Sequence, residues 1–410
     1  MTMAKKATVL GAGIQGVCVS LMLQKHGYRV DLIDQSGDII NRASLTHEGK
    51  IHLGFVYGMD KSLGTGRKMV KDALHFASYL DYLLDKNESW NLLKSKPNIY
   101  LVNWDSMLSP RQVETYFEKL DTYFQDCLAD VSLHYMGERP GAIFKKIDIP
   151  EYVNPDVVSA AFLTEEVSID QSGLKALLKK KILESPSIDL FLGHCVTEIA
   201  REPNDIVVEC KQKDGSTTSF RSDVVFNCLW ESRINFDQMM GLEGEAAHSI
   251  RLKYGLVVKA DDFLRRLHSF TVIHGPYGHF VISPRHARAF CSWYPSSMKG
   301  MMEYGTIPEA WEKACEGYTS DSLIEELKIN NFENFRKIIP SLTKFEILEV
   351  KAGLILAEGN SDITEKNSLL HSRNEFPIRE SAGYYSVSTS KYTSAPRNTM
   401  ILEQMLVSQE

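Results

Sequence analysis

Short apolar runs and a helical pattern follow one another in the first 34 residues. Residues 7–10 are apolar apart from Thr8, which is typical of a strand buried on both faces of a parallel sheet. Apolar residues then recur at helical spacing, at Ile14, Val17, Cys18, Leu21 and Met22. Gly27 stands where a left-handed cap would end this helix, and residues 29–34 form a second run that ends in Asp34. The pattern predicts a strand, a helix and a second, parallel strand.

Later segments show both kinds of pattern. Helical spacing favours a helix, apolar or alternating runs rich in β-branched or aromatic residues favour a strand, and turn residues favour a hairpin turn. They predict helices over 65–84 and 172–183, strands over 189–199 and 224–228, a hairpin over 206–220 that turns at Asp214-Gly215, and antiparallel strands within 250–260 and 269–293.

Strand and helix alternate at the start, in the middle and near the end of the chain. We therefore expect an α/β fold with a discontinuous, Rossmann-like nucleotide-binding domain, a parallel sheet with helices and a β-meander, made from residues 1–64, 161–235 and 346–410. We expect residues 65–160 and 236–345 to form a substrate domain, a mainly antiparallel sheet with helices.

Composition narrows the kind of ligand. A net charge of -7 over 410 residues disfavours nucleic acid and anionic lipid, so we expect a small-molecule ligand. Seven cysteines without a C-x-x-C pair favour reduced thiols in a cytoplasmic protein. Lys5 and Lys6 precede an apolar stretch over 7–23 as in a signal peptide, but glycines interrupt it at a spacing that a nucleotide-binding turn explains. No segment is apolar and long enough to span a bilayer, and no histidine or cysteine spacing indicates a metal site.

The glycine-rich turn after residue 10 has the spacing of a dinucleotide-binding motif. Gly11 allows a tight turn, Gly13 lets the backbone approach a pyrophosphate, and Gly16 lets helix and strand pack closely. Asp34 follows Gly16 by 18 residues, where a carboxylate accepts hydrogen bonds from ribose hydroxyls. These residues predict a bound dinucleotide but do not distinguish FAD from NAD.

Further segments resemble a known family over most of the chain. They are the GAGIQG turn with Asp34, RAS at 42–44, KIHLGFVY at 50–57, residues 165–177 and 191–199, VVFNCL at 224–229, and GYYSVSTSKYTSA at 383–395. The chain resembles the D-amino-acid oxidase-like family of FAD-dependent oxidoreductases, which includes glycine oxidase, sarcosine oxidase and flavin-linked glycerol-3-phosphate dehydrogenase. The resemblance implies an enzyme with FAD as its cofactor.

By this resemblance, the cofactor-binding residues lie in or directly next to these segments, with none from residues 165–177. They are Gly11, Gly13, Ile14, Gln15, Gly16, Asp34, Gln35, Arg42, Ala43, Ser44, Ile51, His52, Val196, Cys228, Trp230, Lys391, Tyr392 and Thr393. Two departures from the family pattern stand out. Trp230 replaces a glycine that permits close backbone approach, and Thr389-Ser390 replaces a glycine pair.

Substrate recognition departs from the family as well. Amino-acid-oxidising members carry a carboxylate-binding arginine in the strand matched by residues 352–356, where this chain has Ile355. Another arginine, such as Arg285 or Arg373, would have to take that role. His52, Tyr277 and Arg373 are the candidate catalytic residues. Each also has a structural explanation: His52 as a histidine that hydrogen-bonds the backbone, Tyr277 in core packing, and Arg373 in a surface ion pair. The resemblance also makes His47 an alternative site for a covalent flavin bond.

The resulting hypothesis is hydride transfer from a carbon bearing an amine, as in an amine or amino acid, to the flavin. Oxidation of a C–OH group, as in a hydroxy acid or glycerophosphate, is the alternative, and the segment around His52 favours it. A non-catalytic flavoprotein is a third. The electron acceptor, the flavin linkage and the oligomeric state stay open.

Overall fold

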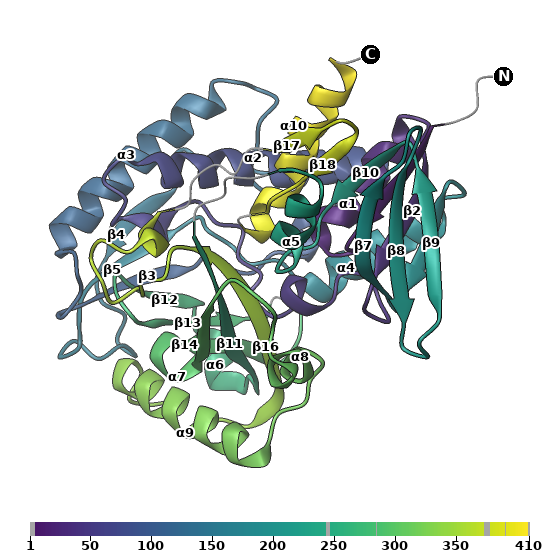
Figure 1. Cartoon of the computed structure of the whole chain (residues 1–410). Helices are drawn as coiled ribbons and strands as arrows, with labels where there is room; N and C mark the ends of the chain where they lie inside the picture. Colours follow the sequence, from purple (N-terminus) through teal and green to yellow (C-terminus); the bar gives the residue numbers. More distant parts are fainter. Residues whose placement is uncertain (1–4, 243–246, 284, 373–377, 390, 409–410) are drawn as a thin grey trace.

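The computed structural model describes residues 5–242, 247–283, 285–372, 378–389 and 391–408. A six-stranded, mostly parallel sheet forms one part (Figure 1). Its order is β17 (Arg379–Ser381), β18 (Tyr384–Ser386), β10 (Val224–Asn227), β1 (Lys6–Leu10), β2 (Arg29–Asp34) and β6 (Ile188–Leu192). Only β17 runs antiparallel to its neighbour. Central strand β1 is almost wholly buried, as its apolar run predicts.

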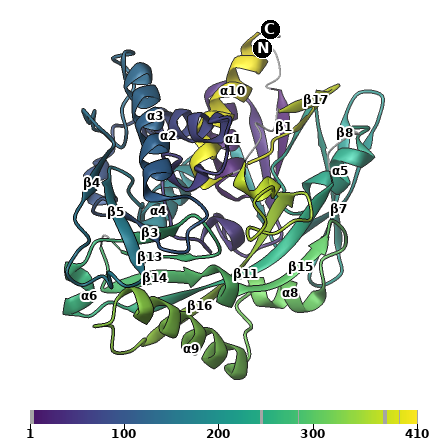
Figure 2. The same cartoon turned by 90° about the vertical axis from the view of Figure 1, so that its left-hand side faces the viewer.

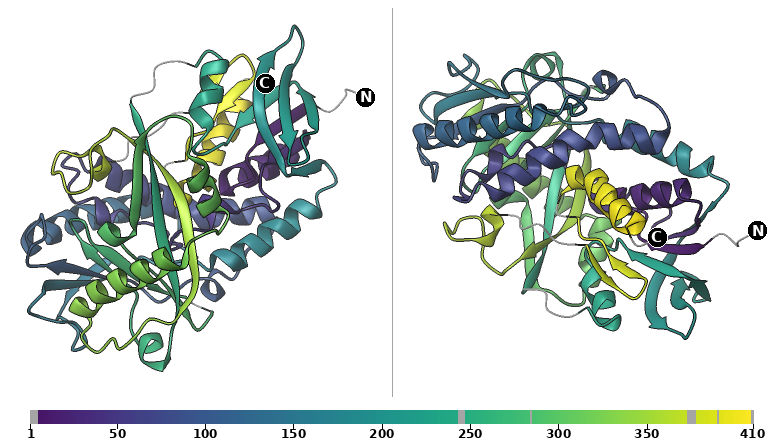
Figure 3. Two further views of the ribbon diagram at one scale, coloured as in Figure 1. Left: turned by 60° about the horizontal axis from the view of Figure 1, so that its bottom comes forward. Right: turned by 90° about the horizontal axis from the view of Figure 1, so that it is seen from above.

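Helices cover this sheet. The helix predicted after the glycine turn is α1 (Ile14–Lys25), and it lies beside the C-terminal helix α10 (Ala395–Val407), which in turn packs on α2 (Gly64–Leu84) (Figure 3). Helix α4 (Gln171–Leu183) also contacts α1. Both α2 and α4 begin within a residue of their predicted starts. Short 3-10 turns are η1 (Arg42–Ser44), η2 (Phe55–Tyr57), η3 (Trp90–Leu92), η4 (Leu369–His371) and η5 (Tyr392–Ser394).

The predicted β-meander is a three-stranded antiparallel sheet of β7 (His194–Arg201), β8 (Ile206–Gln212) and β9 (Thr217–Ser222). Its second turn contains Gly215 at φ 90°, as the Asp-Gly pair predicts. The prediction of one strand over 189–199 is wrong. Gly193 adopts φ 73° and breaks this segment, so that β6 joins the parallel sheet and β7 joins the meander.

A nine-stranded sheet, antiparallel apart from the β12–β3 pair, forms the other part (Figure 2). Its order is β15 (Met298–Glu303), β11 (His248–Lys259), β14 (Arg288–Trp293), β13 (Gly278–Ile282), β12 (Phe270–Ile273), β3 (Ile99–Asn103), β5 (Val158–Thr164) and β4 (Phe144–Ile147), with β16 (Ile347–Glu358) paired to β11. The helices around it are α3 (Pro110–Leu128), α6 (Asp262–Arg266), α7 (Tyr294–Ser297), α8 (Glu309–Cys315) and α9 (Asp321–Ile338). Aromatic packing of Phe335 on Phe270, Phe280 and Trp293 joins α9 to the sheet.

Strand β16 shows where the predicted division of the chain departs from the sheets. The predicted boundary at residue 346 assigns this strand to the nucleotide-binding domain, yet it pairs with β11 from Ile347 to Glu358. Helix α5 (Arg233–Met239), assigned in part to the substrate domain, contacts β10 of the parallel sheet. We therefore propose two domains that follow the two large sheets, with β16 on the antiparallel side.

Candidate active site

The glycine turn after β1 is tightly packed. Gly11 has φ 91°, and a Cβ there would lie 2.9 Å from the backbone oxygen of Cys228. A Cβ at Gly16 would lie 1.8 Å from the oxygen of Gly11, so helix and strand pack as closely as predicted. Asp34 braces the turn, because its carboxylate accepts hydrogen bonds from the backbone N–H groups of Ala12 and Ser36, both at 2.7 Å.

A cavity of about 730 Å³, including space open to solvent, adjoins this turn. The end of β2, turn η1, the start of β7 and the segment after β10 complete its wall. Ten of the predicted cofactor residues line it: Gly11, Gly13, Asp34, Gln35, Arg42, Ala43, Ser44, Val196, Cys228 and Trp230. Arg42 is held there by two ion pairs of 2.8 Å, with Glu231 and with Glu312 of α8.

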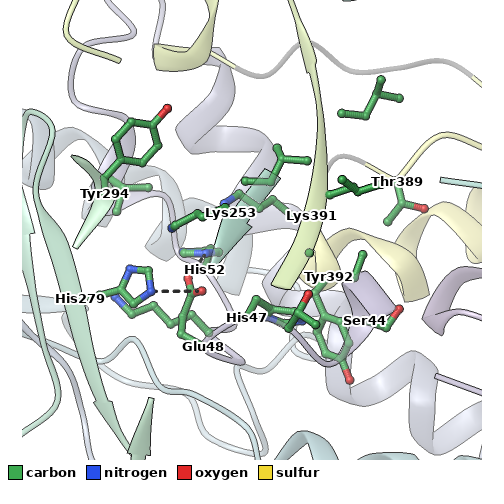
Figure 4. Close-up of a pocket in the computed structure, with 18 of the residues that line it drawn as sticks. Ser44, His47, Glu48, His52, Lys253, His279, Tyr294, Thr389, Lys391 and Tyr392 are labelled. Carbon is green, nitrogen blue, oxygen red and sulfur yellow. Dashed lines mark ion pairs between the residues drawn. The ribbon is translucent and has the colours of Figure 1, made fainter. Parts of the chain in front are cut away.

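A second cavity, of about 1940 Å³ including space open to solvent, continues from the first. The two share the residues Gly13, Ala43, Ser44, Cys228 and Trp230. Predicted residues that line only the larger cavity are Ile14, Gln15, His52, Tyr277, Lys391 and Tyr392 (Figure 4 shows several of them). The structure therefore brings most of the predicted site into one continuous, elongated space.

Three predicted cofactor residues line neither cavity. Gly16 packs α1 on β1, Ile51 is fully buried, and Thr393 accepts a hydrogen bond from the N–H of His52 and donates one to the carbonyl of Lys50, both at 3.2 Å. They support the wall from behind. Arg373 lies outside the described residues.

Trp230, which replaces a family glycine, is accommodated without closing the cavities. Its indole Nε1 donates to the carbonyl of Leu354 on β16 at 3.0 Å. The side chain thereby forms part of the wall that both cavities share.

A cluster of buried ionisable groups lines the larger cavity (Figure 4). Glu48 lies between two histidines: its Oε1 is 3.6 Å from Nε2 of His52 and its Oε2 is 3.6 Å from Nε2 of His279. Nδ1 of His52 is 3.6 Å from Oε2 of Glu166. Glu48 and His279, which are 231 positions apart in the sequence, thus lie side by side, because β13 passes beside the segment that follows η1.

The protonation states in this cluster follow from burial and charge. Burial alone would raise the pKa of Glu48, but the two histidines and Lys391 lower it well below its ordinary range. Burial and Lys391 disfavour the His52 cation, yet Glu166 and Glu48 outweigh them and raise its pKa. Burial lowers the pKa of His279 to about 3 despite the attraction of Glu48. His279 is therefore neutral at neutral pH, and there it is His52 and Lys391 that keep Glu48 ionised.

Glu166 supports the cluster through buried hydrogen bonds and ion pairs. It is fully buried and accepts hydrogen bonds from the N–H of Leu53, at 2.8 Å, and from the hydroxyl of Tyr100. Lys50 lies 3.7 Å away and donates to the hydroxyl of Thr271. Burial would raise the pKa of Glu166, but His52, Lys50 and Tyr100 lower it to about 2.

Replacing Glu166 by glutamine is expected to lower the free energy of unfolding by about 3–5 kcal/mol at pH 7, because Lys50 and His52 lose their buried partner. The lowered pKa stabilises the fold above the ordinary glutamate pKa and ceases to do so as pH falls toward about 2, so the difference should shrink in that window. Denaturant unfolding at several pH values measures it. Glu165→Gln, at a partly exposed neighbour, is the control, and equal stabilities of the two variants at pH 7 would contradict this account.

Arg285 and Tyr277 do not occupy the centre of this site. Arg285 lies in a separate depression with Lys96 and Arg265. Tyr277 lines the larger cavity, but its hydroxyl donates to Asp105 at 2.7 Å. Ile355 lines the cavity as an apolar residue.

Sequence reasoning missed Glu48, His279 and Lys253 as site residues. His279 and Lys253 sit on strands of the antiparallel sheet, and for His279 a polar residue in the otherwise apolar strand β13 was the available signal. Their distance in sequence from the glycine turn gave no reason to place them beside it.

Comparison with protein families decides the class of this protein. A model of the FAD dependent oxidoreductase family, DAO, matches residues 6–385. The chain belongs to this family. The match confirms the family, the enzyme class and the FAD cofactor that the sequence predicts.

Solved structures of this family share the fold at low sequence identity. Glycine oxidase from Geobacillus kaustophilus superposes with a TM-score of 0.66 at 12% identity, over 99% of this chain and 96% of that one. L-alpha-glycerophosphate oxidase from Mycoplasma pneumoniae, solved with FAD bound, gives 0.65 at 14%, over 99% and 95%. L-proline dehydrogenase from P. horikoshii gives 0.65 at 14%, over 100% and 95%. No curated protein sequence matches the chain.

The residues of the oxidoreductase fit FAD. Gly13 begins α1 without a side-chain cap, so the amino end of this helix faces the space shared by the two cavities and suits a pyrophosphate. Asp34 would suit a ribose in the smaller cavity, and Lys391 and Tyr392 line the larger cavity, which would hold the flavin.

The described residues contain neither a membrane-spanning helix nor a cluster of metal ligands. No helix within them is long and apolar enough to cross a membrane. The same residues contain no group of three or more histidine, cysteine, aspartate or glutamate side chains arranged to hold a metal ion.

Proposed function

We propose that this FAD-dependent oxidoreductase oxidises a C–OH group of a small molecule to a carbonyl. The observation that carries the proposal is the contact of Nε2 of His279 with the carboxylate of Glu48, 3.6 Å apart in the wall of the larger cavity. Oxidising a hydroxyl requires a base for its proton, and a histidine backed by a carboxylate is a common one.

Each residue of the cluster has a proposed part in this reaction. When bound, FAD supplies the hydride-accepting N5 atom. His279 accepts the hydroxyl proton, and Glu48 stabilises the imidazolium that forms, although burial disfavours it. His52, whose raised pKa favours its cation, holds Glu48 in place from the other side, and Glu166 orients His52. His52 thus keeps its predicted place at the site, as a positioning residue.

Oxidation of a C–N bond is the second candidate function. The carboxylate of Glu48 in the cavity supports it, because a carboxylate also binds an ammonium group. Ile355 weighs against an amino-acid substrate, since it offers no guanidinium to a substrate carboxylate. An amine also needs no base of the His279 kind if it arrives neutral, so His279 would be left without a role.

Anaerobic bleaching of the flavin tests the proposal. The holoenzyme is mixed with hydroxy acids, glycerol phosphates, amines and amino acids, and its visible absorbance and products are followed. We expect hydroxy compounds to bleach the flavin and give a carbonyl product without ammonia. Bleaching by amines or amino acids alone, with release of ammonia, would establish the second candidate instead.

A further inference from the structure

The paired strands β11 and β16 form part of the wall of the larger cavity. In their antiparallel register, Lys253 lies opposite Gly353, and Arg251 lies opposite Ile355. Opposite residues, and residues two apart on one strand, share a face of a sheet. Lys253, Gly353 and Ile355 line the cavity, as do their neighbours Tyr254, Leu354 and Leu356, whereas Arg251 does not line it.

Arg251 is fully engaged within the protein. It is 1% exposed, and its guanidinium donates to the carbonyl of Ser361 at 2.6 Å and to the hydroxyl of Tyr294 at 3.2 Å. It also pairs with Asp362 at 3.3 Å, and Tyr294 donates to the same carboxylate at 2.6 Å. This arginine therefore has its own counter-ion and is not available to a ligand.

Lys253 differs from Arg251 in this respect. Within the described parts of the chain its ammonium forms no hydrogen bond or ion pair, and its nearest aromatic partner is the ring of Tyr294, 5.8 Å from Nζ to the centroid. Both oxygens of the nearby Glu48 face histidines instead. Figure 4 shows Lys253 on the same side of the cavity as His52 and His279. A half-buried cation in the cavity wall without a partner favours an anion in the space before it.

We propose that Lys253 binds a carboxylate or phosphate group of the substrate, which makes the substrate a small anionic hydroxy compound. The hydroxyl group of this substrate rests on the proposed function, whereas its anionic group rests on Lys253 alone. Lys253 lies opposite Gly353, where a Cβ would lie 2.2 Å from the hydroxyl of Thr46, so the glycine lets Thr46, which also lines the cavity, pack closely on the paired strand. Ile355, two residues further along β16, adds an apolar contact for the carbon skeleton.

The surroundings of Lys253 support this role. Burial lowers its pKa, Glu48 opposes that shift and Lys391 adds to it. The other groups that face it are His279 on β13 and the hydroxyl of Tyr294 on α7. A bound anion restores the charged form of Lys253, so anion binding should weaken as pH rises through the lowered pKa.

The test uses the oxidised holoenzyme with acetate and with inorganic phosphate as probes. Each anion is titrated while the visible flavin spectrum is followed, which needs no turnover. We expect Lys253→Met to raise the dissociation constant about tenfold to a hundredfold, as the loss of a charge-assisted hydrogen bond predicts, and Lys253→Arg to restore most of the affinity. Preference for one probe tells a carboxylate from a phosphate site.

Lys259→Met is the matched control, because Lys259 lies on the same strand, is exposed and pairs with Glu346. If Lys253→Met loses its flavin, Lys253→Gln takes its place. Unchanged anion affinity in the variant that keeps its flavin would overturn the inference. Lys253-dependent anion binding without bleaching by any hydroxy compound would overturn only the proposed function. Equal KM values for neutral and anionic alcohols, unchanged in Lys253→Met, would overturn only the anion site.

Discussion

Replacing His279 by phenylalanine lowers the rate constant of flavin reduction by about 100- to 1000-fold while FAD stays bound. Loss of a positioned general base costs about this much. Phenylalanine keeps the stacking of this ring on Phe290, 5.8 Å between centroids, so the change removes the nitrogen rather than the packing. Stopped-flow reduction under anaerobic conditions, at saturating substrate, measures the effect.

The control for His279→Phe is His75→Phe on α2, where the imidazole hydrogen-bonds Lys71 of its own helix and lies outside both cavities. It should reduce its flavin at the wild-type rate. Adding Glu48→Gln to His279→Phe should cost little more, because two residues that act as a unit are not additive. A reduction rate within about threefold of wild type in His279→Phe would exclude this histidine as the proton acceptor.

Replacing Gly13 by leucine is expected to yield a folded protein that does not retain FAD. Gly13 has φ -67°, which any residue adopts, so the backbone tolerates the change. A Cβ there would already lie 3.2 Å from the hydroxyl of Ser44, and the rest of the side chain would enter the space that joins the two cavities. The amino end of α1 would then be closed to a pyrophosphate.

Purified Gly13→Leu should be colourless, and FAD added to it should not raise its melting temperature, whereas the wild-type apoprotein should gain stability. Gly37→Ala is the control, since no atom lies within 4 Å of its added Cβ. Wild-type flavin content in Gly13→Leu would show that FAD does not pass through the space shared by the two cavities.

Local sequence was sufficient to predict the nucleotide-binding end of the molecule. The glycine turn, α1 and Asp34 lie within 34 consecutive residues, and their spacing alone fixes how strand, turn and helix meet. Helix α3 was predictable as well, because Ser109 and Gln112 form a capping box with Pro110 between them. It was missed because the residues between the predicted helix over 65–84 and about residue 164 were treated as one mixed region.

Long-range strand pairing is the part that the sequence did not reveal. No local sequence pattern shows that β16 pairs with β11 rather than with the parallel sheet. The domain to which a strand belongs depends on the strand that it pairs with. The same pairing places Lys253 in the cavity, and the passage of β13 beside Glu48 brings in His279. His52 was found only because the resemblance identified its segment.

A matched pair of substrates with the same carbon skeleton and the same anionic group, one bearing a hydroxyl and the other an amine, tests the central claim most directly. The rate constant of anaerobic flavin reduction is measured for both compounds in the wild type and in Glu48→Gln. We predict faster reduction by the hydroxy compound, and a loss of about 100-fold or more in the variant for that compound. Faster reduction by the amine, with a hydroxyl rate that Glu48→Gln leaves unchanged, would contradict oxidation of a C–OH group at this site.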